Sequence, residues 1–223
     1  MIWILLALSI VIALYAQFKV RWTFNKYLKV DSDKGITGAT VAQRMLASNG
    51  IHDVTVEMTK GKLSDHYDPK AKAVRLSPDV YSGTSLASLG VAAHEVGHAV
   101  QHNQGYFPLE FRSTLVPVAN IGSMAAFPVI IIGLIAQNTS FMTWGIGLLA
   151  VVLFFQVVTL PVEFNASSRA IGQLKDQGFI GPQEVSGVQK VLTAAALTYV
   201  AAVIVSVLEL ARLLLILKSM ADD

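Results

Sequence analysis

Two histidines and a glutamate near the middle of the chain have side chains and a spacing that suit metal chemistry. They form the pattern His94-Glu95-x-x-His98. On a helix, residues four apart lie on one face with Cβ atoms about 5–6 Å apart, so both imidazoles could bind one zinc ion. Glu95 would then stand beside the metal as a base rather than bind it. The alternative is a buried helix with two hydrogen-bonded core histidines.

A catalytic zinc ion usually has three protein ligands and one open position, so the pattern requires another donor. We predict Glu163, which follows an apolar run and begins a stretch compatible with a helix. The competing interpretation is a carboxylate at the membrane interface that caps the start of a helix. His102 is the rival ligand, but it is rotated by about 40° from His98 and would need a distorted helix.

Three further side chains could act on a substrate rather than on the metal. His66 and Tyr67 could each donate a hydrogen bond to an oxyanion if their segment overhangs the zinc. The alternative is a turn in which Asp65 and Asp68 bind the local backbone. Arg169 is another possible donor to the oxyanion or partner of a ligand, and a surface arginine is an equally good interpretation.

The composition places these residues in a membrane protein. The 223 residues are 53% hydrophobic, and the mean hydropathy is +0.55. Both values are too high for an ordinary soluble domain. The absence of cysteine excludes disulfides, thiolate zinc sites and cysteine nucleophiles. A formal charge of +2 gives no reason to expect nucleic acid as a partner, whereas a lipid bilayer is an expected one.

Four apolar runs are long enough to span that bilayer, and they cover residues 2–18, 118–137, 141–160 and 194–217. We therefore predict a mainly α-helical membrane fold with about four transmembrane helices. The short connection between the two middle runs allows only a tight antiparallel helical hairpin.

Three polar or kinking residues bear on these runs. Pro128 should kink the first helix of the hairpin. Glu209 and Arg212 interrupt the last run at a spacing that lets them pair on one helix face. They could mark a polar feature inside the bundle, or the place where the helix leaves the bilayer.

The runs and the polar segments between them define five predicted parts of the chain. The first run is read as an uncleaved anchor, because no basic residue precedes it and no clear cleavage site follows. The parts are 1–18, the first anchor; 19–116, a polar domain with the zinc-motif helix; 117–161, a transmembrane helical hairpin; 162–193, a segment that supplies the third zinc ligand; and 194–223, the last transmembrane helix and the C-terminus.

The positions of the basic residues predict the orientation. Twelve of the seventeen Lys and Arg lie in 19–116, and three more lie in 162–193. The positive-inside rule places both polar segments in the cytoplasm and both termini outside. This prediction rests on residues 19–29 and 169–190, because the rule weakens for long loops.

The polar domain has mixed helix and strand signals. We expect an amphipathic helix over 37–48, a strand over 54–58 and a hairpin of 63–67 with 73–76 around an Asp-Pro-Lys turn. The zinc-motif helix should run from about Ser85 to Asn103, with Thr84 or Ser85 as its N-cap. The free edge of the hairpin could pair with an extended peptide, or the hairpin could simply cover the helix.

The motifs together resemble one family over nearly the whole chain. Residues 90–102, 64–69 and 160–164 look like the bacterial membrane-bound neutral zinc metallopeptidases, the YugP-like family. The resemblance implies a zinc-dependent, multi-pass membrane peptidase. With the orientation given by the basic residues, we expect a protein of the inner or plasma membrane with a small zincin-like α+β domain on the cytoplasmic side. The resemblance also implies that His94 and His98 are zinc ligands and that Glu95 is the catalytic base.

Glu163 also resembles the ligand glutamate of a broader group that has Glu-x-x-x-Asp after the zinc helix, including membrane proteases of the HtpX and Ste24 type. In that group the aspartate orients a zinc-bound histidine. The matching position here is Ser167. The partner of the imidazole is therefore left open between Ser167 and another group.

These observations lead to a hypothesis of peptide-bond hydrolysis by Glu95-assisted attack of a zinc-bound water. Expected substrates are membrane proteins or unfolded segments near the bilayer. A non-catalytic zinc-stabilised scaffold or binding protein is the alternative, although a structural site would not need Glu95. A hydrolase of non-peptide amides would use the same chemistry.

Overall fold

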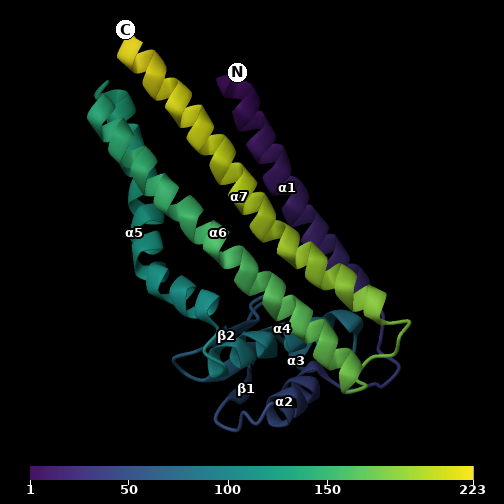
Figure 1. Cartoon of the computed structure of the whole chain (residues 1–223). Coiled ribbons are helices and arrows are strands. Elements are labelled where there is room, and N and C mark those ends of the chain that lie inside the picture. Colours follow the sequence, from purple (N-terminus) through teal and green to yellow (C-terminus); the bar gives the residue numbers. More distant parts are fainter. Residues whose placement is uncertain (223) are drawn as a thin grey trace. The chain divides into compact units, whose positions relative to one another are not determined.

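The structure is a computed structural model that describes residues 1–222, and it is mostly helical (Figure 1). The described elements follow one another as α1 (Ile2–Tyr27), α2 (Gly38–Ser48), β1 (Thr55–Met58), β2 (His66–Asp68), β3 (Ala73–Leu76), α3 (Pro78–Tyr81), α4 (Leu86–Asn103), α5 (Phe107–Ile135), α6 (Thr139–Asp176) and α7 (Val185–Asp222).

The chain divides into two compact units, and α1, α5, α6 and α7 each contribute to both. The site unit comprises residues 18–109 and 162–197. The apolar unit comprises residues 1–17, 110–161 and the described chain from 198 onward. The five parts predicted from the sequence stay a prediction.

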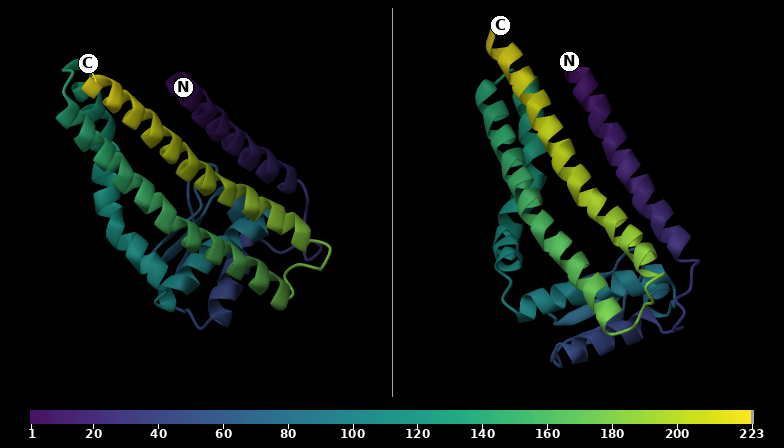
Figure 2. Two further views of the ribbon diagram at one scale, coloured as in Figure 1. Left: turned by 45° about the horizontal axis from the view of Figure 1, so that its top comes forward. Right: turned by 45° about the vertical axis from the view of Figure 1, so that its right-hand side comes forward.

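Four helices, α1, α5, α6 and α7, are long and apolar enough to cross a membrane, as the hydropathy pattern predicted. Each extends well beyond its apolar run, and Figure 2 shows α1, α6 and α7 each as one uninterrupted coil. A helix satisfies its own backbone hydrogen bonds whether its side chains meet lipid or water. Polarity therefore did not predict where these helices end: α1 continues to Tyr27 and α6 to Asp176.

The apolar unit exposes large hydrophobic side chains, as expected for helices that lie in lipid. Examples are Trp3, Ile121, Met124, Ile135 and Trp144. Asn138 caps α6 by accepting hydrogen bonds from the backbone of Ser140 and Phe141, which closes the predicted tight hairpin.

Two other predictions concern α5 and α7. Helix α5 contains Pro117 and Pro128, and Figure 1 shows that it changes direction along its length. A kink at Pro128 itself stays a prediction. Arg212 donates hydrogen bonds to Glu209, so the predicted pair on α7 is confirmed.

The site unit contains a three-stranded sheet in the order β1-β3-β2. Strands β2 and β3 pair antiparallel, so the predicted hairpin is confirmed. Strand β1 pairs parallel with β3 on the other side, a pairing that the sequence did not predict. Strand β2 is therefore an edge strand. Asp65 fixes the base of the hairpin by accepting hydrogen bonds from the backbone and hydroxyl of Ser77.

Helices α2 and α4 form the core of the site unit beneath this sheet. The predicted helix over 37–48 is α2, with Thr37 as its N-cap and its apolar stripe of Val41, Met45 and Leu46 buried. Ser85 caps α4 by accepting a hydrogen bond from the backbone of Ser88. Most of α4 is buried, so its polar side chains must find partners inside the protein.

Candidate metal centre

Helix α4 places the two histidines of the motif on one face. The ring centroids of His94 and His98 are 4.7 Å apart, and the ring planes are nearly perpendicular at 86°. This is the arrangement expected for residues four apart on a regular helix. Both rings are largely shielded from solvent, with side-chain exposures of 14% and 11%.

Glu163 comes from α6 and meets both rings. Its Oε2 atom lies 3.2 Å from Nε2 of His94 and 3.6 Å from Nε2 of His98. One donor atom from each of the three residues lies within 4.8 Å of the others, so the group could hold a metal ion. Two imidazole nitrogens and one carboxylate oxygen are a donor set that suits a catalytic zinc ion. The residues therefore fit the metal that the motif predicts.

A glycine on α4 lets α6 come this close. A Cβ atom at Gly97 would lie 2.8 Å from the backbone oxygen of Ala166, a distance that side chains do not tolerate. Ala166 is three residues beyond Glu163 on α6. Only glycine at position 97 allows the contact between the helices that brings the carboxylate to the histidines.

His98 is held on its outward side by its own helix. Its Nδ1 atom lies 3.0 Å from Oε1 of Gln101, which is fully buried. The amide nitrogen of Gln101 in turn donates to the backbone oxygen of Val162 and to Oδ1 of Asn165, both at 2.9 Å. Gln101 therefore orients His98 and ties α4 to α6 with the same side chain.

Arg169 extends this chain of hydrogen bonds outward. Its Nε atom donates to Oδ1 of Asn165 at 2.7 Å, and its Nη1 atom donates to Oε1 of Gln104 at 2.7 Å. The guanidinium also lies over the ring of Tyr106, 5.9 Å from its centroid. Arg169 thus acts on His98 through two intermediate amides.

His94 is held on its outward side by a hydrogen bond with α6. Its Nδ1 atom lies 3.1 Å from Oγ of Ser167. Both histidines therefore turn Nε2 toward Glu163 and Nδ1 toward a hydrogen-bond partner. A hydrogen on Nδ1 that is donated to such a partner leaves the Nε2 lone pair available for a metal.

Burial also changes the acid–base properties of the motif. Glu95 is buried, and burial raises the pKa of its carboxyl group, although the neighbouring His94 and His98 partly offset this. Burial would lower the pKa of His98, but the hydrogen bond with Glu163, the negative charges of Glu95 and Glu163 and the hydrogen bond with Gln101 together outweigh it, so the pKa is raised. Glu95 is thus a stronger base than an ordinary carboxylate.

The other predicted site residues make hydrogen bonds with partners outside the group of His94, His98 and Glu163. Nδ1 of His102 lies 2.8 Å from the hydroxyl of Tyr67, so the rival ligand faces the sheet. His66 is exposed, and its Nδ1 atom lies 2.8 Å from the backbone oxygen of Ser64. Together with the contacts of Arg169, these pairs leave the predicted oxyanion donor a prediction.

Sequence reasoning missed Gln101 and Asn165. A signal for Gln101 was present, because it lies three residues after His98 on the same helix face. Asn165 lies two residues after Glu163, but nothing in the sequence linked it to a glutamine 64 residues away.

Comparisons with known proteins show which family the chain is similar to. A family described as "Putative neutral zinc metallopeptidase" matches residues 2–218. The chain is also 47% identical over 212 residues to "Putative membrane protease YugP" of Bacillus subtilis (strain 168), a match that covers 95% of this chain and 94% of that protein. No solved structure matches the chain.

Proposed function

The chain belongs to the neutral zinc metallopeptidase family, and on this premise we propose that it is a zinc-dependent endopeptidase of the membrane. The observation that carries the proposal is the meeting of His94, His98 and Glu163 within 4.8 Å, with the buried Glu95 beside them. In this proposal the first three residues hold the metal and Glu95 is the catalytic base.

Zinc in such a site supplies the acidification of a water molecule and the polarisation of the scissile carbonyl group. The residues of the chain supply the proton transfers. Glu95 takes a proton from the attacking water and then delivers it to the nitrogen of the leaving amine. The raised pKa of Glu95 favours both steps, because a catalytic base works best when its pKa approaches the working pH. Ser167 and Gln101 keep the two imidazoles oriented.

An extended substrate could bind along β2. This strand is at the edge of the sheet, and its Tyr67 is joined to α4 through His102. A peptide that adds to a free strand edge receives main-chain hydrogen bonds regardless of its sequence. We therefore propose a zincin-like domain in which the substrate lies between β2 and α4.

The proposed location is the cell membrane, inner or plasma, with multiple passes and the site on the cytoplasmic side. Four helices are long and apolar enough to span. The basic residues of 19–29 and 169–190 flank the apolar runs of these helices and favour the cytoplasmic side. Membrane proteins or unfolded segments near the bilayer are the proposed substrates.

Cleavage of a fluorescently labelled casein by the purified full-length chain tests the proposal. Wild-type protein should cleave it, and a chelator should stop cleavage. Glu95→Gln should retain stoichiometric zinc and lose turnover, whereas Glu163→Ala should lose zinc in elemental analysis. Glu110→Gln, which alters an exposed carboxylate, is the matched control and should behave as wild type. Undiminished cleavage by Glu95→Gln would remove the proposed base, and zinc without cleavage in the wild type would favour the scaffold.

A further inference from the structure

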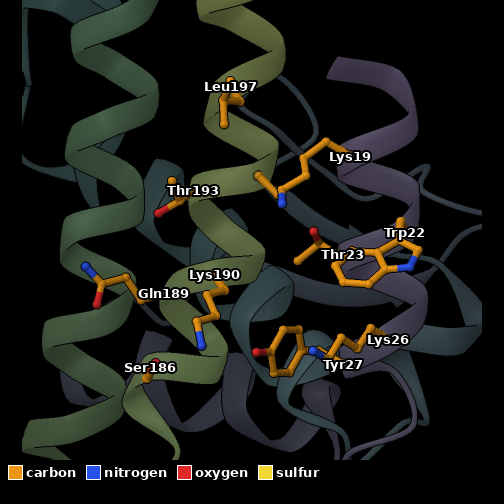
Figure 3. A pocket seen from close by; sticks show the side chains of 11 residues that line it. Lys19, Trp22, Thr23, Lys26, Tyr27, Ser186, Gln189, Lys190, Thr193 and Leu197 are labelled. Carbon is orange, nitrogen blue, oxygen red and sulfur yellow. The ribbon is translucent and has the colours of Figure 1, made fainter. Parts of the chain in front are cut away.

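A second hollow in the site unit is unrelated to the metal centre. It is a cavity of about 500 Å³ between the end of α1 and the start of α7, a size typical of ligand pockets. Figure 3 shows the lining side chains on these two neighbouring helices. Its lining residues recur every three to four positions on each helix, so each helix presents one face: Lys19, Trp22, Thr23, Lys26 and Tyr27 on α1, and Ser186, Gln189, Lys190, Thr193, Ala194 and Leu197 on α7.

The cavity concentrates positive charge. Lys19, Lys26 and Lys190 line it, and none of the eleven lining residues is acidic. Among the residues that the structure describes, no carboxylate forms an ion pair with these three lysines. The ammonium group of Lys26 lies 5.3 Å from the ring centroid of Trp22 and 5.6 Å from that of Tyr27. Three lysines that line one cavity without a carboxylate partner indicate a site for an anion.

A buried hydroxyl provides a second, independent sign of a ligand. Thr23 lines the cavity and is only 3% exposed. Its Oγ1 atom has no hydrogen-bond partner in the described part of the chain. A buried hydroxyl is almost always hydrogen-bonded, because leaving it unpaired is costly. The missing partner is accounted for by a ligand that brings an acceptor oxygen into the cavity.

The position of the cavity along the helices indicates where that ligand comes from. Lys19 directly follows the apolar run 2–18, and Ala194 begins the apolar run 194–217. The cavity therefore lies at the level where one apolar run ends and the other begins, and Ala194 and Leu197 are apolar lining residues that belong to a predicted membrane span. A half-exposed Trp22 at this level suits the membrane interface. The ligand should itself have an anionic end and an apolar end.

We propose that this cavity binds the headgroup of an anionic glycerophospholipid. Lys19, Lys26 and Lys190 surround the phosphate, the Thr23 hydroxyl donates to a phosphate oxygen, and the acyl chains leave past Leu197. Basic pockets between membrane helices bind phospholipid headgroups in this way. A lipid held there would link α1 to α7 within the site unit.

Ligand titration of the full-length protein in detergent, read by native mass spectrometry, tests the proposal. The probes are dioctanoyl phosphatidylglycerol, dioctanoyl phosphatidylcholine and inorganic phosphate. We expect one phosphatidylglycerol per chain, at least tenfold weaker binding of phosphatidylcholine, and no displacement by millimolar phosphate. Equal binding of the two lipids would overturn the role of charge, and displacement by phosphate at equal affinity would assign the cavity to the free ion.

Lysine variants test whether phosphatidylglycerol binds in this cavity. Replacement of Lys19, Lys26 and Lys190 by Gln should weaken phosphatidylglycerol binding on the order of 100-fold, at about 1 kcal/mol per lysine. The control replaces the exposed Lys34, Lys60 and Lys175 by Gln, which removes the same charge and should change binding less than about threefold. Equal losses in the two triple variants would show diffuse attraction and overturn the site.

The Thr23 variants keep the test decisive if the triple variant fails to fold. Thr23→Val preserves shape and charge but removes the hydroxyl, so binding should weaken about tenfold. Thr23→Ser should restore it. Wild-type affinity in Thr23→Val would overturn the proposed contact with the phosphate.

Discussion

The two histidines of the metal centre lie on one helix, yet their surroundings differ. His98 is backed by Gln101, a buried neighbour on its own helix, and the contact continues to Asn165 and Arg169. Within residues 1–222, His94 is backed only by the hydroxyl of Ser167, which belongs to α6. The orientation of His98 is thus set largely within α4, whereas that of His94 depends on where α6 lies.

The two supports meet α6 on either side of Ala166. Asn165 belongs to the His98 support and Ser167 to the His94 support, and Gly97 packs against the residue between them. The separation of α4 and α6 at this contact is therefore common to both supports and to Glu163. We call His98 with Gln101 the His98 half of the centre, and His94 with Ser167 the His94 half. Changes at the contact between α4 and α6 should weaken metal binding by both halves, and changes further out should weaken only one.

The largest loss of zinc affinity is expected from Gly97→Ala, which should disturb the surroundings of both His94 and His98. The new Cβ would lie 2.8 Å from a backbone oxygen that cannot rotate away, so the helices must separate. We expect a loss of about 1–3 kcal/mol in stability and a larger loss of zinc affinity than in any variant below. Elemental analysis and thermal unfolding in detergent measure both.

Gly172→Ala is the matched control for that experiment. A Cβ there meets nothing within 4 Å, so the change should leave zinc binding intact and stabilise the helix by about 0.5–1 kcal/mol. If Gly97→Ala binds zinc and unfolds like the wild type, the close contact of α4 and α6 is not what positions Glu163.

Gln101→Leu should break the His98 half. It removes the acceptor for Nδ1 of His98 and the donor to the backbone oxygen of Val162 and to Oδ1 of Asn165. Asn165 keeps Arg169 as a donor. Loss of such a support typically lowers metal affinity about 10–100-fold, and the loss of the buried hydrogen bonds between α4 and α6 should cost about 1–3 kcal/mol. Zinc competition with a chromogenic chelator and chemical unfolding report the two effects separately.

Gln101→Glu sharpens the same experiment. It keeps an acceptor for His98 but loses the donor to α6, so zinc affinity should recover while stability stays low. Equal zinc affinity in Gln101→Leu and the wild type would mean that His98 needs no support.

The metal ligands that lie close together in sequence were easier to predict than the partners that orient them. His94 and His98 follow from a single helical pattern, and Glu163 follows from the need for a third donor after the membrane hairpin. The partner of His94 stayed open because a serine stands where the resemblance to Glu-x-x-x-Asp proteases leads one to expect aspartate, and only the packing of α4 on α6 brings Ser167 within 3.1 Å.

The same distinction applies to the fold. The β2–β3 hairpin was predictable from a turn between adjacent segments, but the parallel pairing of β1 with β3 joins segments that no turn connects. The apolar runs revealed the four long helices, since hydropathy indicates which segments can lie in lipid. They did not reveal where each helix ends, because the hydrogen bonds of a helix continue into polar sequence.

Ser167→Ala should have a smaller effect, confined to the His94 half. The hydroxyl is only partly buried, so water can replace it more readily than it can replace Gln101. We expect about a tenfold loss of zinc affinity and little change in stability. Ser167→Asp, which supplies the aspartate of the Glu-x-x-x-Asp pattern, should bind zinc at least as tightly as the wild type. A loss in Ser167→Ala larger than that in Gln101→Leu would reverse the comparison of the two halves.

The smallest effect is expected from Arg169→Ala, because Arg169 reaches His98 only through Asn165 and Gln101. Its loss should cost about 0.5–1.5 kcal/mol in stability and only about two- to threefold in zinc affinity. A double-mutant cycle sharpens the comparison, since residues in one hydrogen-bond network are not additive whereas separate ones are. The effect of Arg169→Ala on zinc affinity should vanish in a Gln101→Leu background and persist in a Ser167→Ala background. The same effect in both backgrounds would show that Arg169 acts on the centre by a route other than the amide chain.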